Sequence, residues 1–136
     1  MKTHFLKIVS IVFIVNMAAS CDPGFAYSKV IQNDSDFDVI IHVHGASIDY
    51  SADSFYVSKR SEEAILVGSG LGQTFEFEDC NLYADSLTAA IADADTMKVL
   101  TELNDLSNWT FTVLNKTFKG GGTCECRIII NNDQIE

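Results

Sequence analysis

Residues Tyr27 to Val43, YSKVIQNDSDFDVIIHV, decide the fold class of this chain. The first part, Tyr27 to Gln32, has the composition of a β-strand, and apolar residues alternate from Phe37 to Val43 as in a strand with one buried face. Between them, Asn33 to Asp36 consists of residues that favour turns. We therefore predict two strands joined as a hairpin.

Further strand-like runs follow at short intervals along the chain. They are Phe55–Val57, Ala64–Val67, Thr74–Glu78, Trp109–Leu114 and Cys124–Ile130. A polar turn at residues 59–63 precedes the second run, and we expect Gly68, Gly70 and Gly72 to end it. The spacing predicts an all-β fold, an antiparallel Ig-like β-sandwich of about seven to nine strands in one domain over residues 27–136.

Residues 85–103 fit two patterns. Leu87, Ala90, Ile91 and Ala94 lie at helical spacing, but Leu87, Ala89 and Ile91 also alternate as in a strand. We prefer a strand, a turn at residues 93–96 and a second strand, because the neighbouring segments have strand patterns.

The first 20 residues have the anatomy of a secretory signal peptide, which we expect to form a helix. Lys2 and Lys7 precede an apolar run, Ile8–Val15, that is too short to span a bilayer of about 30 Å. Cys21 follows three small residues and resembles the lipidated cysteine of bacterial lipoproteins. That resemblance implies a lipid on Cys21 and a membrane tether over residues 21–26. Ordinary cleavage, which leaves Cys21 as a thiol or half of a disulfide, is the alternative.

The charge of the chain is strongly negative. Two of the nine basic residues precede Cys21 and all 19 acidic residues follow it, so the 116 residues from Cys21 onward carry a formal charge of −12. This charge opposes binding to nucleic acid, which requires clustered Lys and Arg. We also find no catalytic or phosphate-loop motif, and we predict a non-enzymatic protein without a cofactor.

Two groups of residues could carry chemistry. His42 and His44 share one face of a strand and, with a third ligand, could hold a metal ion, which makes a metal- or small-ligand-binding module the alternative function. Cys124 and Cys126 also share a face, so we expect a structural disulfide from Cys80 to one of them. Such a loop of ~45 residues would contribute ~4 kcal/mol to stability.

The chain also resembles the small lipoproteins of Bacteroidetes. The resemblance is carried by a tethered cysteine, by a YSxxIxNxSDxDI-like segment and by a closing strand. The matching residues are Tyr27, Ser28, Ile31, Asn33, Ser35, Asp36, Phe37, Val39, Asn108, Trp109 and Arg127–Asp133. It implies a β-sandwich at the cell envelope. Beyond the resemblance, we expect the outer membrane as the location and a protein or glycan as the partner. Asp85-Ser86-Leu87 and Asp95-Thr96-Met97 look like the O-glycosylation motif of Bacteroides, which makes Ser86 and Thr96 candidate sites.

Overall fold

The computed structural model describes residues 24–46, 50–71, 79–94, 96–117 and 120–136. The leader, Cys21 and the expected strand Thr74–Glu78, which falls within residues 72–78, lie outside these ranges. The described chain forms two β-sheets. The first contains, in spatial order, β4 (Ser61–Leu71), β1 (Gly24–Asn33), β7 (Gly122–Ile130) and β6 (Thr110–Lys116). The second contains, in spatial order, β3 (Ser54–Val57), β2 (Val39–His44) and β5 (Ser86–Ile91).

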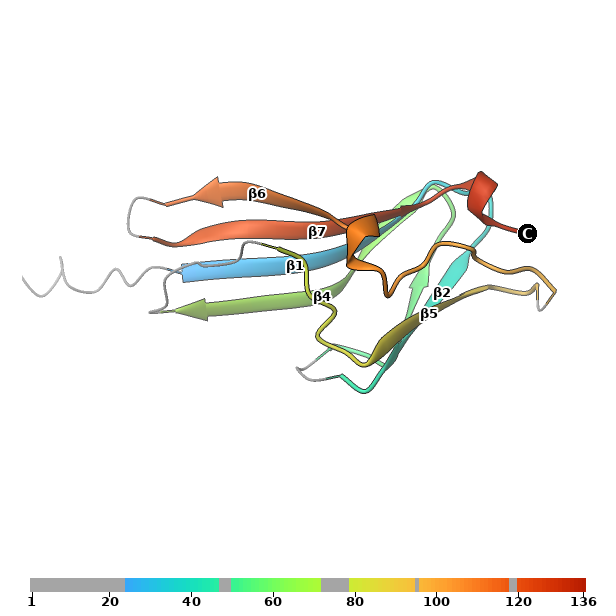
Figure 1. The fold of residues 1–136 in the computed structure, drawn as a ribbon, viewed down its shortest axis with the longest axis horizontal. Helices are drawn as coiled ribbons and strands as arrows, with labels where there is room; N and C mark the ends of the chain where they lie inside the picture. The colour runs from blue at the N-terminus through green and yellow to red at the C-terminus, as the bar shows by residue number, and fades with distance from the viewer. Residues whose placement is uncertain (1–23, 47–49, 72–78, 95, 118–119) are drawn as a thin grey trace, which may run out of the picture.

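The two sheets enclose one apolar core, as in a β-sandwich. Figure 1 shows the three-stranded sheet lying against one end of the four-stranded sheet, the end nearer the C-terminus. Alternate residues along the strands are buried between the sheets. They include Ile31, Val39, Ile41, Val57, Ile65, Leu87, Ile128 and Ile130. The prediction of an all-β, two-sheet fold is therefore confirmed. Two short 3-10 helices, Leu106–Asn108 and Asn132–Gln134, complete the described elements.

The predicted hairpin over Tyr27–Val43 is wrong, because β1 and β2 belong to different sheets. The reason is the buried side chain of Asn33. Its amide nitrogen lies 2.8 Å from the carbonyl oxygen of Phe37, 3.1 Å from that of Val57 and 3.2 Å from that of Ser58. These bonds turn the chain from one sheet to the other at a corner, where a hairpin would have kept both strands in one sheet.

The sheets are not purely antiparallel. The first strand, β1, pairs with the last strand, β7, in parallel, whereas β4 pairs antiparallel with β1 and β6 with β7. This pairing places two segments that are far apart in the sequence side by side. The sequence pattern predicted the strands but carried no information on this pairing.

Two segments differ in detail from the expectation. Residues 24–26, which we assigned to the tether, form the start of β1. Gly68 and Gly70 do not end β4, which continues to Leu71. A side chain at Gly70 would lie 2.3 Å from the ring of Phe25, so the glycine lets this ring pack across the strand.

In residues 85–103 the strand pattern is correct and the helical pattern is not. β5 covers Ser86–Ile91 and is followed by a turn in which Asp93 has a φ of 59°. The returning segment makes isolated bridges at Lys98 and Val99. The second predicted strand is therefore reduced to two contact points.

Candidate functional site

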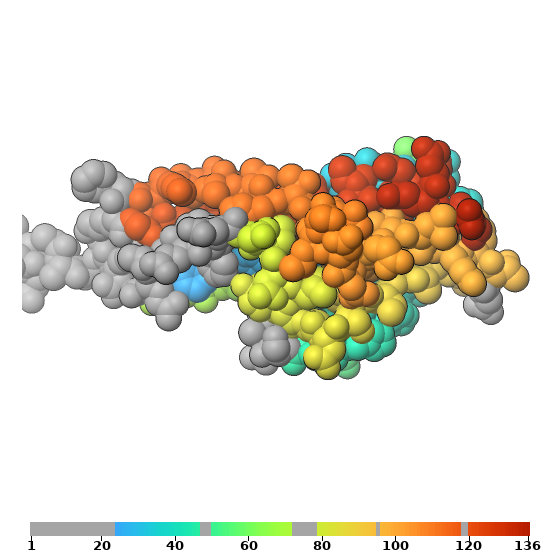
Figure 2. Space-filling view, in the orientation of Figure 1, coloured from blue at the N-terminus to red at the C-terminus, as the bar shows by residue number. Residues whose placement is uncertain are grey.

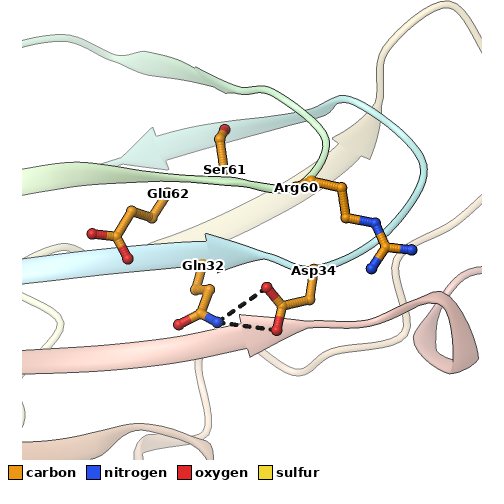
Figure 3. Close-up of a pocket in the computed structure, with 5 residues that line it drawn as sticks. All are labelled: Gln32, Asp34, Arg60, Ser61 and Glu62. Atoms are coloured by element: carbon orange, nitrogen blue, oxygen red, sulfur yellow. Dashed lines mark hydrogen bonds between the residues drawn. The ribbon is translucent and has the colours of Figure 1, made fainter.

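The outer face of the four-stranded sheet carries two hollows. Arg127 of β7 lines one of them and contacts Gln32 and Glu62, which line the other. The first has a volume of about 210 Å³. It is lined by Gln32, Asp34, Arg60, Ser61 and Glu62. Figure 3 shows Gln32 and Asp34 facing each other, with Glu62 and Arg60 at opposite ends. The Gln32 amide donates to both carboxylate oxygens of Asp34, each at 3.0 Å.

The second hollow has a volume of about 320 Å³ and lies over β6 and β7. Its lining comprises Asn108, Thr110, Thr112, Glu125, Arg127 and Ile129. The register places Thr110 opposite Arg127 and Thr112 opposite Glu125, so four side chains at alternate positions point outward together. Ile129, which is 41% exposed, adds an apolar contact. Hydroxyl, amide, carboxylate and guanidinium groups beside this single apolar side chain suit a polar, hydroxyl-rich ligand or a protein loop.

Arg127 is held in place between the two hollows by acceptors from three strands. Its Nε donates to Glu125 at 2.7 Å and its Nη1 donates to the Gln32 side chain at 2.8 Å, while an ion pair joins it to Glu62 of β4. These hydrogen bonds, to Glu125 first and then Glu62, raise the pKa of Arg127 above its ordinary value. They also lower the pKa of Glu62. The surface is therefore a fixed array of paired charges.

We call this surface the Arg127 face: the residues lining the two hollows. Sequence reasoning did not single it out. Alternation along Cys124–Ile130 places Glu125, Arg127 and Ile129 on one side of a strand. Their partners from β1 and β4 become neighbours only through the parallel pairing of β1 with β7.

His42 and His44 lie on the same side of β2, with ring centroids 6.5 Å apart. His44 is exposed, and its Nε2 lies 3.0 Å from the hydroxyl of Thr88. Among the described residues, no group of three or more His, Cys, Asp or Glu side chains could hold a metal ion. The structure therefore brings the two imidazoles together without a third ligand from the described part of the chain.

The cysteines divide into a bonded pair and a buried thiol. Cys80 is bonded to Cys126, with Cα atoms 5.7 Å apart, which selects one of the two pairings left open by the sequence. Cys124 is buried, and burial raises the pKa of its thiol. Cys21 lies outside the described residues.

The two candidate glycosylation sites differ in exposure. Ser86 begins β5, lies opposite His44 and is half-buried. Thr96 lies in the turn after β5 and is exposed.

The structure also contains a buried lysine that sequence reasoning missed. Lys29 of β1 is 0% exposed. Its Nζ donates to the carbonyl oxygen of Asn81 at 3.0 Å and lies 3.5 Å from the centroid of the Trp109 ring. Burial lowers the pKa of Lys29 to about 7. The signal was available, because Tyr27, Lys29 and Ile31 share the core-facing positions of one strand.

No protein-family model, curated protein or solved structure matches this chain. The resemblance to the Bacteroidetes lipoproteins therefore stays a prediction. None of the described helices is long and apolar enough to cross a membrane.

Proposed function

We propose that this protein is a non-enzymatic lipoprotein of the bacterial cell envelope that binds a protein or glycan partner through the Arg127 face. In this proposal Cys21 carries the lipid, the outer membrane is the location and the sandwich is of the Ig-like type. The signal-peptide pattern of residues 1–20 supports export. The Cys80–Cys126 disulfide also supports it, because such bonds persist mainly in oxidising compartments.

The observation that carries the binding role is the pair of hollows whose linings are joined through the contacts of Arg127. A binding surface benefits from side chains that are already ordered, because less conformational entropy is lost on association. Arg127 is ordered by contacts to Gln32, Glu62 and Glu125. The formal charge of all 136 residues is −10, and this negative charge favours a neutral or basic partner over an acidic one.

A variant that fills the second hollow tests the binding role. Thr112→Arg puts a long side chain into this hollow while leaving the contacts of Arg127 to β1 and β4 in place. Ala90→Arg is the control, since Ala90 is an exposed strand residue of the other sheet and is not a register partner of His42 or His44. On an array of bacterial glycans and with envelope proteins captured by crosslinking, Thr112→Arg should lose the ligands that wild type and the control retain. Equal binding by all three proteins would contradict the proposal.

Anchoring is tested separately. Cells that express the wild-type chain should show acyl modification of a peptide beginning at Cys21, by mass spectrometry of the membrane fraction. Cys21→Ser should abolish the modification and release the protein from that fraction. An unmodified Cys21 in the mature protein would contradict the lipoprotein part of the proposal.

A further inference from the structure

One irregular segment, Asp79–Asp85, covers the buried amine of Lys29; we call this segment the strap. It connects the four-stranded sheet to β5 (Figure 1). In Figure 2 its yellow-green atoms lie at the surface, next to the orange atoms of the chain that precedes β6. It contains no strand or helix of its own. Its position therefore depends on side-chain contacts and on the disulfide.

Within the described part of the chain, the strap is fixed by the packing of Leu82, Tyr83 and Ala84 against the core and by a small set of specific bonds. The Cys80–Cys126 disulfide bonds it to β7. The carbonyl oxygen of Asn81 accepts hydrogen bonds from Lys29 at 3.0 Å and from the Tyr27 hydroxyl at 3.4 Å. The Tyr83 ring meets Tyr27 edge to face, with centroids 5.6 Å apart. The Tyr50 hydroxyl donates to the carbonyl oxygen of Leu82. The backbone amide of Asp85 donates to the carbonyl oxygen of His44 at 2.9 Å.

The disulfide and the acceptor for Lys29 are directly linked. Lys29 and Cys126 are register partners on the parallel strands β1 and β7. Asn81 follows Cys80 in the chain, so the bond from Cys80 to Cys126 sets the Asn81 carbonyl beside the Lys29 amine. Breaking this bond removes the covalent restraint nearest to the amine.

Lys29 favours departure of the strap. No ion pair among the described residues includes it, and its Nζ contacts the carbonyl oxygen of Asn81 and the ring of Trp109. Among the described residues the buried ammonium group contacts only a carbonyl oxygen and an aromatic ring, which partly replace the hydration lost on burial. Water would solvate it fully if the strap moved away.

We propose that the Cys80–Cys126 disulfide is a redox-controlled latch, and that its reduction releases the strap and exposes Lys29 and Trp109 while the two sheets stay folded. The reductant is a dithiol. It transfers two electrons and two protons, becomes a disulfide itself, and leaves Cys80 and Cys126 as thiols. Cys80 is 4% exposed and Cys126 is 0% exposed, so the attack requires a transient opening of the strap. The released state adds a cation and an aromatic ring to an acidic surface.

The test measures the acylation of lysine amines by a water-soluble active ester, with mass spectrometry of the peptides. The protein is the full chain carrying Cys21→Ser and Cys124→Ser, which prevents exchange with the other two cysteines of the sequence. In the oxidised protein the exposed residues Lys59 and Lys116 should react and Lys29 should be protected. After reduction by a dithiol, the acylation rate of Lys29 should rise at least about tenfold, while the rates at Lys59 and Lys116 stay unchanged.

Intrinsic fluorescence supplies a second measurement, because Trp109 is the one tryptophan of the sequence. Reduction should shift its emission to longer wavelength as the ring meets water. Cys80→Ala should show the shifted emission and fast acylation of Lys29 without any reductant. Amide hydrogen exchange in β2 and β7 should stay slow in both states.

Two results would overturn the latch. In the first, Lys29 stays protected although alkylation shows that Cys80 and Cys126 are both reduced. In the second, amide exchange becomes fast throughout both sheets, which makes the disulfide a general structural bridge. Neither result depends on whether the Arg127 face binds a partner.

Discussion

The two faces of the four-stranded sheet each carry a cationic side chain, but the surroundings of the two cations are opposite in kind. On the outer face, Arg127 contacts two carboxylates and an amide oxygen. On the inner face, Lys29 contacts a carbonyl oxygen and an aromatic ring, and it is fully buried. The pKa of Arg127 is raised by its partners, whereas the pKa of Lys29 is lowered by burial to about 7. The comparison shows that hydration and partners, more than strand position, decide what a charge contributes to this sheet.

A polar side chain on the inner face does not destabilise the protein only when all its hydrogen bonds are made. Substitution of Asn33 tests this rule and should have the largest effect. Its side chain is fully buried and its amide bonds to three carbonyl groups. Asn33→Ala should destabilise the protein by about 3 kcal/mol, because buried carbonyls lose their donors. Chemical denaturation measures the loss. Asn115→Ala, at an exposed position of β6, is the control and should change little. Equal stability of the two variants would contradict this account of the corner.

Lys29 offers the second test, through pH. The unfolded lysine holds its proton up to the ordinary pKa of 10.5, whereas the folded one releases it above about 7. Between these values the unfolded state binds more protons, so the stability of the wild type rises with pH. Relative to Lys29→Met, it should gain about 2 kcal/mol between pH 7 and pH 9. The thiol of Cys124 titrates equally in both proteins and cancels.

Denaturation curves at pH 7, 8 and 9 measure this difference. Lys29→Met should also be the more stable protein at pH 7, because it buries no charge. Lys116→Met, at an exposed site, should run parallel to the wild type at every pH. If the difference between wild type and Lys29→Met does not change with pH, the amine of Lys29 is hydrated in the folded protein.

These sites mark what could be predicted from the sequence. Alternation predicted most strands, and it placed Cys124 and Cys126 on the same face of one strand, which the structure shows to be the buried face. It predicted a hairpin turn at Asn33 wrongly. Two of the acceptors of the Asn33 amide, on Val57 and Ser58, lie 24 and 25 residues away, and no local sequence pattern indicates them. A lysine in a strand is normally expected to face water, so the core-facing position of Lys29 was overlooked.

The Arg127 face was out of reach for a different reason. Its residues come from β1, β4, β6 and β7, and from the segments that flank them. Each strand alone shows which residues point outward, but the choice of neighbours depends on the pairing of β1 with β7, which are far apart in the sequence. Such long-range parallel pairing leaves no period in the sequence.

Of these substitutions, Arg127→Met should have the smallest effect on stability. Its opposite pH dependence to that of Lys29→Met is the most direct test of the difference between the two faces of the sheet. The side chain of Arg127 is 26% exposed and that of Glu62 is 57% exposed, so water screens the ion pair between them. The loss at neutral pH should therefore be about 1 kcal/mol or less. The pH dependence follows from the lowered pKa of Glu62. The contribution of the Glu62–Arg127 ion pair to stability is present above the ordinary glutamate pKa and is lost as the pH falls through the lowered value. Wild type and Arg127→Met should thus converge in acid, whereas wild type and Lys29→Met converge in base. A stability difference for Arg127→Met that persists unchanged into acid would mean that Arg127 acts through packing of its side chain and not through its charge.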